Sequence, residues 1–160
     1  MMPDNLFNSN VLDSQILECV WQALVFTLPH YHIVKTPAAG YFSLRPAQSG
    51  ELFLVRFFGN CAPEYRQAYY TTSIQNGELL KDNPRLISSC TEKNPDEKGC
   101  GSAIRTNTAI LSFAGYTRQA DEAVVVMAAR LLRLISQHEC ESIANLSGNE
   151  VLLKLLQPQS

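Results

Sequence analysis

Apolar residues recur at three- and four-residue steps between residues 13 and 29, which is the spacing of one face of an α-helix. Asp13 or Ser14 can accept hydrogen bonds from the free N–H groups of the first turn. Pro29 ends the pattern, because the residue before a proline is disfavoured in the helical conformation. The stripe consists of Ile16, Leu17, Val20, Trp21, Leu24 and Leu28. The pattern therefore predicts an N-terminal helix.

The middle of the chain changes to short runs rich in aromatic and aliphatic residues, which are typical of strands. Residues 41–45 and 51–59 form two such runs, and residues 48–50 between them have turn chemistry, so a hairpin is predicted. Residues 66–74 are rich in Tyr and Thr and end at an Asn-Gly turn signal, residues 76–77. They predict a third strand, placed beside the hairpin in a meander.

The last third of the chain predicts one more strand and two helices. Residues 108–116 form a buried strand, and residues 118–139 a long helix that is apolar over most of its circumference. Such a helix is expected to be buried on two sides, by the sheet and by a second cover. Asn149 is placed to cap a short helix over residues 150–156, which Pro158 stops, and this helix is the expected cover.

Together these elements predict an α+β fold. It has an N-terminal helix, an antiparallel sheet of four or five strands, a long C-terminal helix and a short terminal helix. We expect a single domain over residues 1–160, since this length suits one core. Residues 1–10 are expected to be a flexible leader and residues 81–106 a long polar loop excursion. The helices are expected on one face of the sheet, with the other face partly open.

Composition and charge narrow the function classes. The chain has 13 basic and 15 acidic residues, a net charge of -2 and no three adjacent basic residues, so nucleic-acid binding is not expected. No apolar run reaches the roughly 18 residues of a membrane span, and no secretory signal is present, which predicts a cytoplasmic protein without membrane association. Neither a phosphate-binding loop nor a Walker lysine occurs, and no cofactor is expected.

His30 and His32 flank Tyr31, so in an extended segment both imidazoles point to the same side. Neutral imidazole is a good metal ligand, and this arrangement is how HUH-type nucleases hold their metal. Such an enzyme also needs a tyrosine nucleophile, for which Tyr69 and Tyr116 are candidates. The alternative interpretation is that the two histidines are partly exposed residues where a helix gives way to a strand.

The five cysteines offer a second kind of chemistry. Cys61 follows a predicted strand and a glycine, where a nucleophilic thiol can lie, and one of the three histidines, His138 included, would be its base. Cys90 and Cys100 flank a charged loop, but no cysteine pair has the roughly two- to four-residue spacing of a structural zinc site. In a reducing cytoplasm the thiols are expected to stay free.

Asp121 and Glu122 lie in the first turn of the long predicted helix. Acidic side chains in that turn interact favourably with the helix dipole. A structural role is therefore expected for both carboxylates, in preference to acid–base catalysis.

Aromatic residues gather between residues 41 and 70, and arginines accompany them on neighbouring predicted strands. An exposed aromatic face would be a platform for a ligand or a partner. The residues predicted to form this binding face are Tyr41, Arg45, Phe53, Arg56, Phe58 and Tyr69.

These observations favour a small, non-catalytic interaction module of adaptor, chaperone or immunity type. Its partner is expected to be another protein or a second copy of the chain. A homodimer would form through the aromatic sheet face or the C-terminal helices. The alternative function is a small metal- or cysteine-dependent hydrolase or nuclease that uses His30, His32 and Cys61 or a tyrosine.

Overall fold

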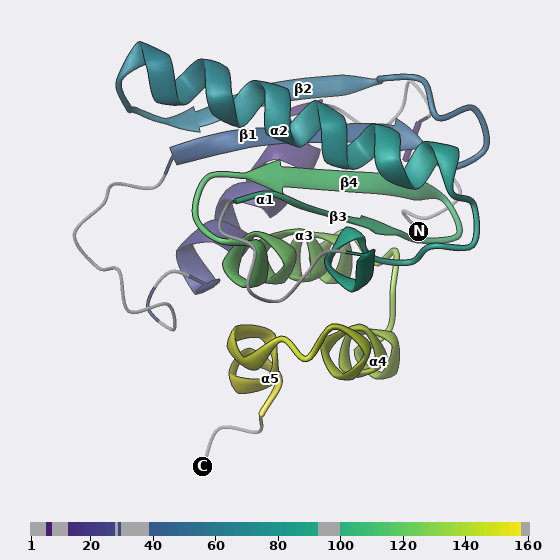
Figure 1. The fold of residues 1–160 in the computed structure, drawn as a ribbon. Helices are drawn as coiled ribbons and strands as arrows, with labels where there is room; N and C mark the ends of the chain where they lie inside the picture. Colours follow the sequence, from purple (N-terminus) through teal and green to yellow (C-terminus); the bar gives the residue numbers. More distant parts are fainter. Residues whose placement is uncertain (1–5, 8–12, 28, 30–38, 93–99, 158–160) are drawn as a thin grey trace.

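The computed structural model of the protein describes residues 6–7, 13–27, 29, 39–92 and 100–157 (Figure 1). In chain order the elements are α1 (Asp13–Thr27), β1 (Ala39–Pro46), β2 (Leu54–Gly59), α2 (Pro63–Asp82), the 3-10 helix η3 (Ser89–Glu92), β3 (Ser102–Arg105), β4 (Ala109–Ala114), α3 (Arg118–Leu131), α4 (Gln137–Ser147) and α5 (Glu150–Leu156).

The four strands form one antiparallel sheet with the order β2-β1-β4-β3. β1 and β2 form the predicted hairpin, in which Tyr41 lies opposite Phe57 and Ser43 lies opposite Val55. β4 pairs with both β1 and β3, so β1 and β4 are the central strands. The predicted α+β fold with an antiparallel sheet is confirmed.

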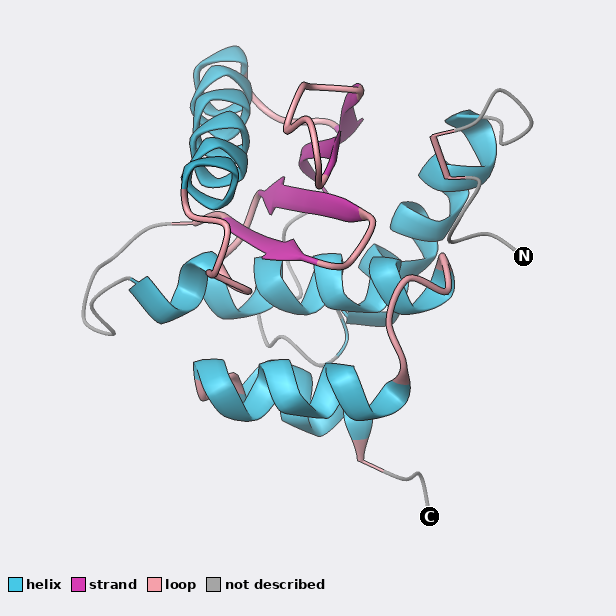
Figure 2. Ribbon diagram, turned by 90° about the vertical axis from the view of Figure 1, so that its right-hand side faces the viewer, coloured by secondary structure: helices cyan, strands magenta, loops and turns pink. Residues whose placement is uncertain are grey.

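Helices cover both faces of the sheet (Figures 1 and 2). α2 crosses the face that carries Ser43 and Arg45, whereas α1 and α3 pack on the opposite face, around Phe42 and Leu44. α4 and α5 form a further layer, in which α5 packs against α3. The prediction that one face stays open is wrong, because that face is covered by α2, a helix that the hydrophobic pattern does not indicate.

The extra helix is α2, which contains the 66–74 segment that the sequence predicts to be a strand. Pro63 opens the helix, at a position where its missing N–H is no loss. The residues of α2 that are buried recur at helical spacing, but most of them are small or polar: Ser73, Asn76, Gly77 and Leu80. The strand propensity of Tyr and Thr was therefore overridden by packing, and no hydrophobic stripe indicated the helix.

The long helix predicted over residues 118–139 begins as expected but ends at Leu131. Arg133 takes a left-handed backbone conformation with φ 63°, which turns the chain. Ser136 and Glu139 then form a capping box that begins α4. α3 is buried on two sides, as predicted, between the sheet and α1 on one side and α5 on the other. Asn149 caps α5 through the N–H of Leu152, which confirms the predicted cap.

Part of the polar excursion predicted over residues 81–106 is regular structure. α2 continues to Asp82, and Ser88 forms an isolated antiparallel bridge with Ile104. In the predicted leader, Leu6 is buried in the core and Phe7 packs against it.

Candidate functional site

The six residues predicted to form one binding face do not share a face. Alternate residues of β1 and β2 point to opposite sides of the sheet, and each side has its own helical cover. Tyr41, Arg45 and Tyr69 lie on the α2 side, Arg56 and Phe58 lie on the α1 side, and Phe53 precedes β2 and contacts Phe7. The prediction was a single aromatic platform on an open sheet face. The structure instead has two aromatic groups, one on each side of β2.

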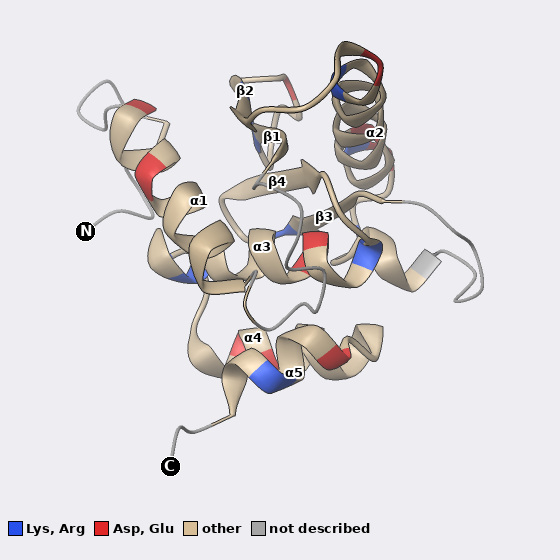
Figure 3. Cartoon of the chain, turned by 90° about the vertical axis from the view of Figure 1, so that its left-hand side faces the viewer, with Lys and Arg blue, Asp and Glu red and all other residues tan. Residues whose placement is uncertain are grey.

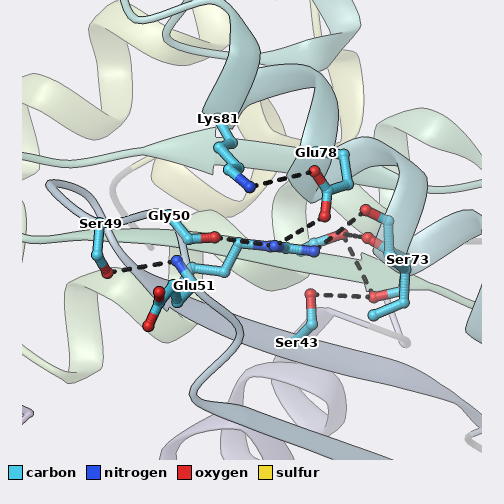
Figure 4. Close-up of polar contacts among 10 residues, drawn as sticks. Ser43, Ser49, Gly50, Glu51, Ser73, Glu78 and Lys81 are labelled. Carbon is cyan, nitrogen blue, oxygen red and sulfur yellow. Dashed lines mark hydrogen bonds and ion pairs between the residues drawn. The ribbon is translucent and has the colours of Figure 1, made fainter.

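Arg45 is a structural side chain, not part of an exposed surface. Figure 4 labels two of its partners, Gly50 and Glu78. Its guanidinium donates to the carbonyl oxygen of Gly50 at 3.0 Å and to that of Ile74 at 3.4 Å. It also pairs with Glu78 Oε1 at 3.2 Å. Gly77 leaves room for it, because a Cβ at that position would lie 2.7 Å from Arg45 Nε. Arg45 thus fastens α2 to the turn after β1.

Three serines let α2 approach the sheet closely near this arginine. Ser73 Oγ lies 3.4 Å from Ser43 Oγ and 3.3 Å from Ser112 Oγ, and Ser112 Oγ donates to the Ser73 carbonyl at 2.7 Å. All three are buried. Their hydroxyls pair with one another, so this layer is polar but satisfied.

The two outer edges of the sheet differ. The β3 edge is closed by the segment before it, since Arg105 N–H donates to the Ile87 carbonyl at 2.7 Å and Ala103 N–H donates to Ser89 Oγ at 2.9 Å. β2 ends the sheet on the other side, and no other described strand pairs with its outer edge. An unpaired edge offers a row of backbone donors and acceptors to an added strand.

The α1 side of this edge carries exposed apolar side chains. Trp21 stacks on Phe58 of β2, with ring centroids 6.4 Å apart and planes 13° apart. Val25 and Phe26 lie on the outer face of α1 and are exposed. Together with Gln22 and Pro29, Trp21, Val25 and Phe26 line a shallow depression of about 480 Å³. We call Trp21, Val25, Phe26 and Phe58 the α1 flank.

The α2 side of the same edge carries a second aromatic group. The Tyr41 ring lies 5.1 Å from that of Phe57 and 5.3 Å from that of Tyr70. The Arg66 guanidinium lies over the Phe57 ring at 4.3 Å, a cation–π contact. We call Tyr41, Phe57, Arg66 and Tyr70 the α2 flank. The β2 edge surface consists of β2 and both flanks.

Charges are sparse on the β2 edge surface. Arg56 and Arg66 are exposed, and neither forms an ion pair with any carboxylate of the described residues. Figure 3 shows both acidic and basic residues on α2 and on the layer formed by α4 and α5. Within the described part of the chain, no helix has the length and hydropathy needed to cross a bilayer.

The alternative, catalytic site was predicted from His30, His32, Cys61 and Tyr69. His30 and His32 lie outside the described residues. His138 lies on α4, in the layer beyond α3, whereas Cys61 precedes α2 on the opposite side of the sheet (Figure 1). The fold therefore does not bring His138 to Cys61, and the described residues contain no group of three His, Cys, Asp or Glu side chains able to hold a metal ion.

Tyr69 has neighbours that could take part in chemistry, at the end of the sheet where α2 begins. Burial raises the pKa of its hydroxyl, and nearby Cys100 and Cys61 raise it further. A tyrosine nucleophile needs its ionised form, which a raised pKa disfavours. This electrostatic environment argues against a nucleophilic role for Tyr69.

The Cys90 thiol is equally unsuited to catalysis. Burial, followed by the nearby Glu122 carboxylate, raises the pKa of this thiol to about 12. Its Sγ lies 3.0 Å from Ser102 Oγ, and neither Cys90 nor Cys100 is in a disulfide. Reactive cysteines have a lowered pKa, so Cys90 is a structural thiol.

Asp121 and Glu122 are more important to the fold than their predicted interaction with the helix dipole suggests. Both are fully buried. The Asp121 carboxylate accepts backbone N–H groups from Gly101 at 2.7 Å and from Tyr116 at 3.0 Å. Burial raises its pKa to about 7, although these hydrogen bonds act in the opposite direction.

Glu122 connects three more segments to α3. Its carboxylate accepts hydrogen bonds from Ser147 Oγ at 2.7 Å, from Asn149 Nδ2 at 2.9 Å and from the Ser88 hydroxyl. The sequence signal for this network is the adjacent acid pair, Asp121 and Glu122, in a helix that is otherwise mostly apolar. A helix that is apolar over most of its circumference has little exposed surface for two adjacent acids, whose directions differ by about 100° around the axis.

No protein-family model, no curated protein and no solved structure matches this chain. The candidate site with the most support from the geometry is the β2 edge surface.

Proposed function

We propose that the protein is a non-catalytic interaction module that binds through the β2 edge surface and forms a homodimer there. Adaptor, chaperone and immunity roles all depend on such a surface. The cytoplasm is the proposed compartment, which agrees with five cysteines that are all free thiols.

The observation that carries this proposal is the contrast between the two sheet edges. The chain uses residues 86–92 to close the β3 edge, but β2 has no such cover among the described residues. Exposed edges in monomeric proteins are usually blunted by charge, proline or a covering loop. β2 carries one charged residue, Arg56, beside Phe57 and Phe58, and exposed aromatic side chains lie on both flanks.

The hydrolase or nuclease alternative has less support. Of its predicted residues, Tyr69 has a raised pKa, which favours its unreactive, protonated form, and the fold does not bring His138 to Cys61. Arg45, which was predicted to bind, is buried and holds α2 against the turn after β1. Among the described residues, His138 and Cys61 therefore do not form the base-and-nucleophile pair that covalent catalysis needs.

Light scattering of the wild-type protein and two variants tests the proposal. We expect a wild-type mass of twice 17.8 kDa at micromolar concentration. Trp21→Glu places a charge in the α1 flank, where Trp21 is 41% exposed, and should weaken the dimer at least tenfold, about 1.4 kcal/mol. Leu146→Glu is the matched control, because Leu146 is also on a helix, is 61% exposed and lies on α4. It should leave the mass unchanged.

A monomeric wild-type protein would contradict the proposed homodimer. Dissociation by Leu146→Glu but not by Trp21→Glu would instead place the interface on the C-terminal helices. Circular dichroism of both variants shows whether each retains the helical fold.

A further inference from the structure

The proposed homodimer can be narrowed to one register of the two β2 strands, and this inference rests on the proposed function. We infer that β2 pairs antiparallel with β2 of a second copy, about a two-fold axis perpendicular to the sheet, with Phe57 opposite Phe57. The two sheets would then form one continuous sheet of eight strands.

The symmetry decides which flanks meet. A two-fold axis perpendicular to the sheet makes neighbouring strands antiparallel and keeps each face of the sheet on its own side. The α1 flank of one copy therefore meets the α1 flank of the other, and the two α2 flanks also meet. A single added peptide strand would leave most of Trp21, Val25 and Phe26 in water, whereas a second copy brings its own α1 to cover them.

The pleat limits the registers that such a pair can adopt. Residues directly opposite each other must lie on the same face of the sheet. The axis must therefore pass midway between a residue of β2 and the same residue of the second copy. An axis at Arg56 would set the two arginines opposite each other, which is unfavourable. An axis at Val55 would set Arg56 opposite Leu54 of the second copy. This register is also unfavourable, because Leu54 is already buried in the core of its own chain.

An axis at Phe57 has complementary chemistry on both faces. On the α2 side, Phe57 lies opposite its own copy, and aromatic pairs across antiparallel strands are stabilising. On the α1 side, Arg56 lies opposite Phe58 of the second copy, beside the Trp21 that stacks on it, and Arg56 has no carboxylate partner among the described residues. A cation facing these rings is complementary in charge to their negative faces.

Disulfide cross-linking in the reduced and then diamide-oxidised protein tests the register. Phe57→Cys should give a covalent dimer, because opposite Cα atoms in an antiparallel pair are about 4.5–5.5 Å apart, within disulfide range. Val55→Cys is the matched control on the same face. In this register the two copies of residue 55 are displaced by roughly 13 Å along the strands and should not cross-link. The wild-type protein shows any background from its own cysteines, and mass spectrometry of the peptides locates the 57–57 bond.

A second pair of variants tests the same register without altering Phe57. A mixture of Arg56→Cys and Phe58→Cys chains should cross-link at least fivefold faster than either variant alone, because these positions face each other only across the axis at Phe57. Light scattering of each reduced variant confirms that it is dimeric before oxidation.

Three outcomes overturn the inference. Cross-linking of Val55→Cys in place of Phe57→Cys would move the axis to Val55. Failure of both, and of the mixed pair, in dimeric protein would remove β2 from the axis. Either result leaves the proposed homodimer in place, whereas a monomeric wild-type protein would contradict that function as well.

Discussion

Asp121 fixes two connections of the fold although its carboxylate has no exposure to water. It accepts N–H groups from Gly101, at the start of β3, and from Gly115 and Tyr116, between β4 and α3. Without these bonds, the buried N–H of Gly101 would lose its partner, at a cost of about 1–3 kcal/mol. The same burial disfavours the charged form of Asp121 and raises its pKa to about 7.

The raised pKa of Asp121 predicts stability that falls as the pH rises. The pKa changes from 3.8 to about 7 on folding, so the folded protein binds more protons between these two values. The free energy of unfolding should therefore decrease from about pH 4 to about pH 7, by at most about 4 kcal/mol, and should lose nothing further from this group above that range. Urea unfolding at about pH 4 and at about pH 7, the ends of this window, measures the change.

Asp121→Asn is the control for this pH dependence. The amide cannot ionise, so its unfolding free energy should vary less between the two pH values than that of the wild-type protein. Equal pH profiles for the two proteins would show that Asp121 does not titrate in this window.

The contacts of Arg45 predict that substitutions of the two members of its ion pair with Glu78 differ greatly in their effect on the free energy of unfolding. Arg45→Met removes the donor to the Gly50 and Ile74 carbonyls and should lower the free energy of unfolding by about 2–4 kcal/mol. Glu78→Ala removes a partner whose side chain is 44% exposed and should cost under about 1 kcal/mol. Similar losses in urea unfolding would mean that the ion pair, not the two carbonyl contacts, supplies the stability.

At the scale of elements, local signals predicted the structure well where they were specific. The turn at residues 48–50 joins β1 and β2, and the Asn149 cap begins α5. α2 was missed because its contact with the sheet uses serines, Asn76 and Gly77, which carry no apolar periodicity. The end of α3 was missed because apolar residues continue past it, although Ser136 and Glu139 have the spacing of a capping box.

The turn between α3 and α4 predicts a stabilising substitution. Arg133 has φ 63°, which costs a residue with a Cβ roughly 1 kcal/mol, and glycine avoids this cost. Arg133→Gly should therefore raise the free energy of unfolding by about 0.5–1 kcal/mol. Arg133→Ala keeps the Cβ and should stay near the wild-type value in the same urea titration. A gain from alanine equal to that from glycine would attribute the effect to the lost charge.

At the scale of the whole molecule, the layers decide which surfaces remain for a partner. α2 covers one face of the sheet, and α1 and α3 cover the other, so the aromatic residues of β1 and β2 reach water only around the β2 edge. The predicted binding residues Arg56 and Phe58 belong to that edge, whereas Arg45 does not. Whether Phe57 and Trp21 meet a second copy there is the question that the light scattering and cross-linking experiments answer.

The sequence by itself determined the α+β class, the β1–β2 hairpin, the N-terminal helix and the cap of α5, because these depend on patterns and hydrogen bonds within a few residues. Only the tertiary structure decided that residues 66–74 are helical, that Arg45 is buried and that both faces of the sheet are covered. Those outcomes depend on contacts between segments far apart in the chain, such as Ser73 with Ser112 and Arg45 with Glu78. Such contacts can outweigh local propensity, and a single sequence does not display them.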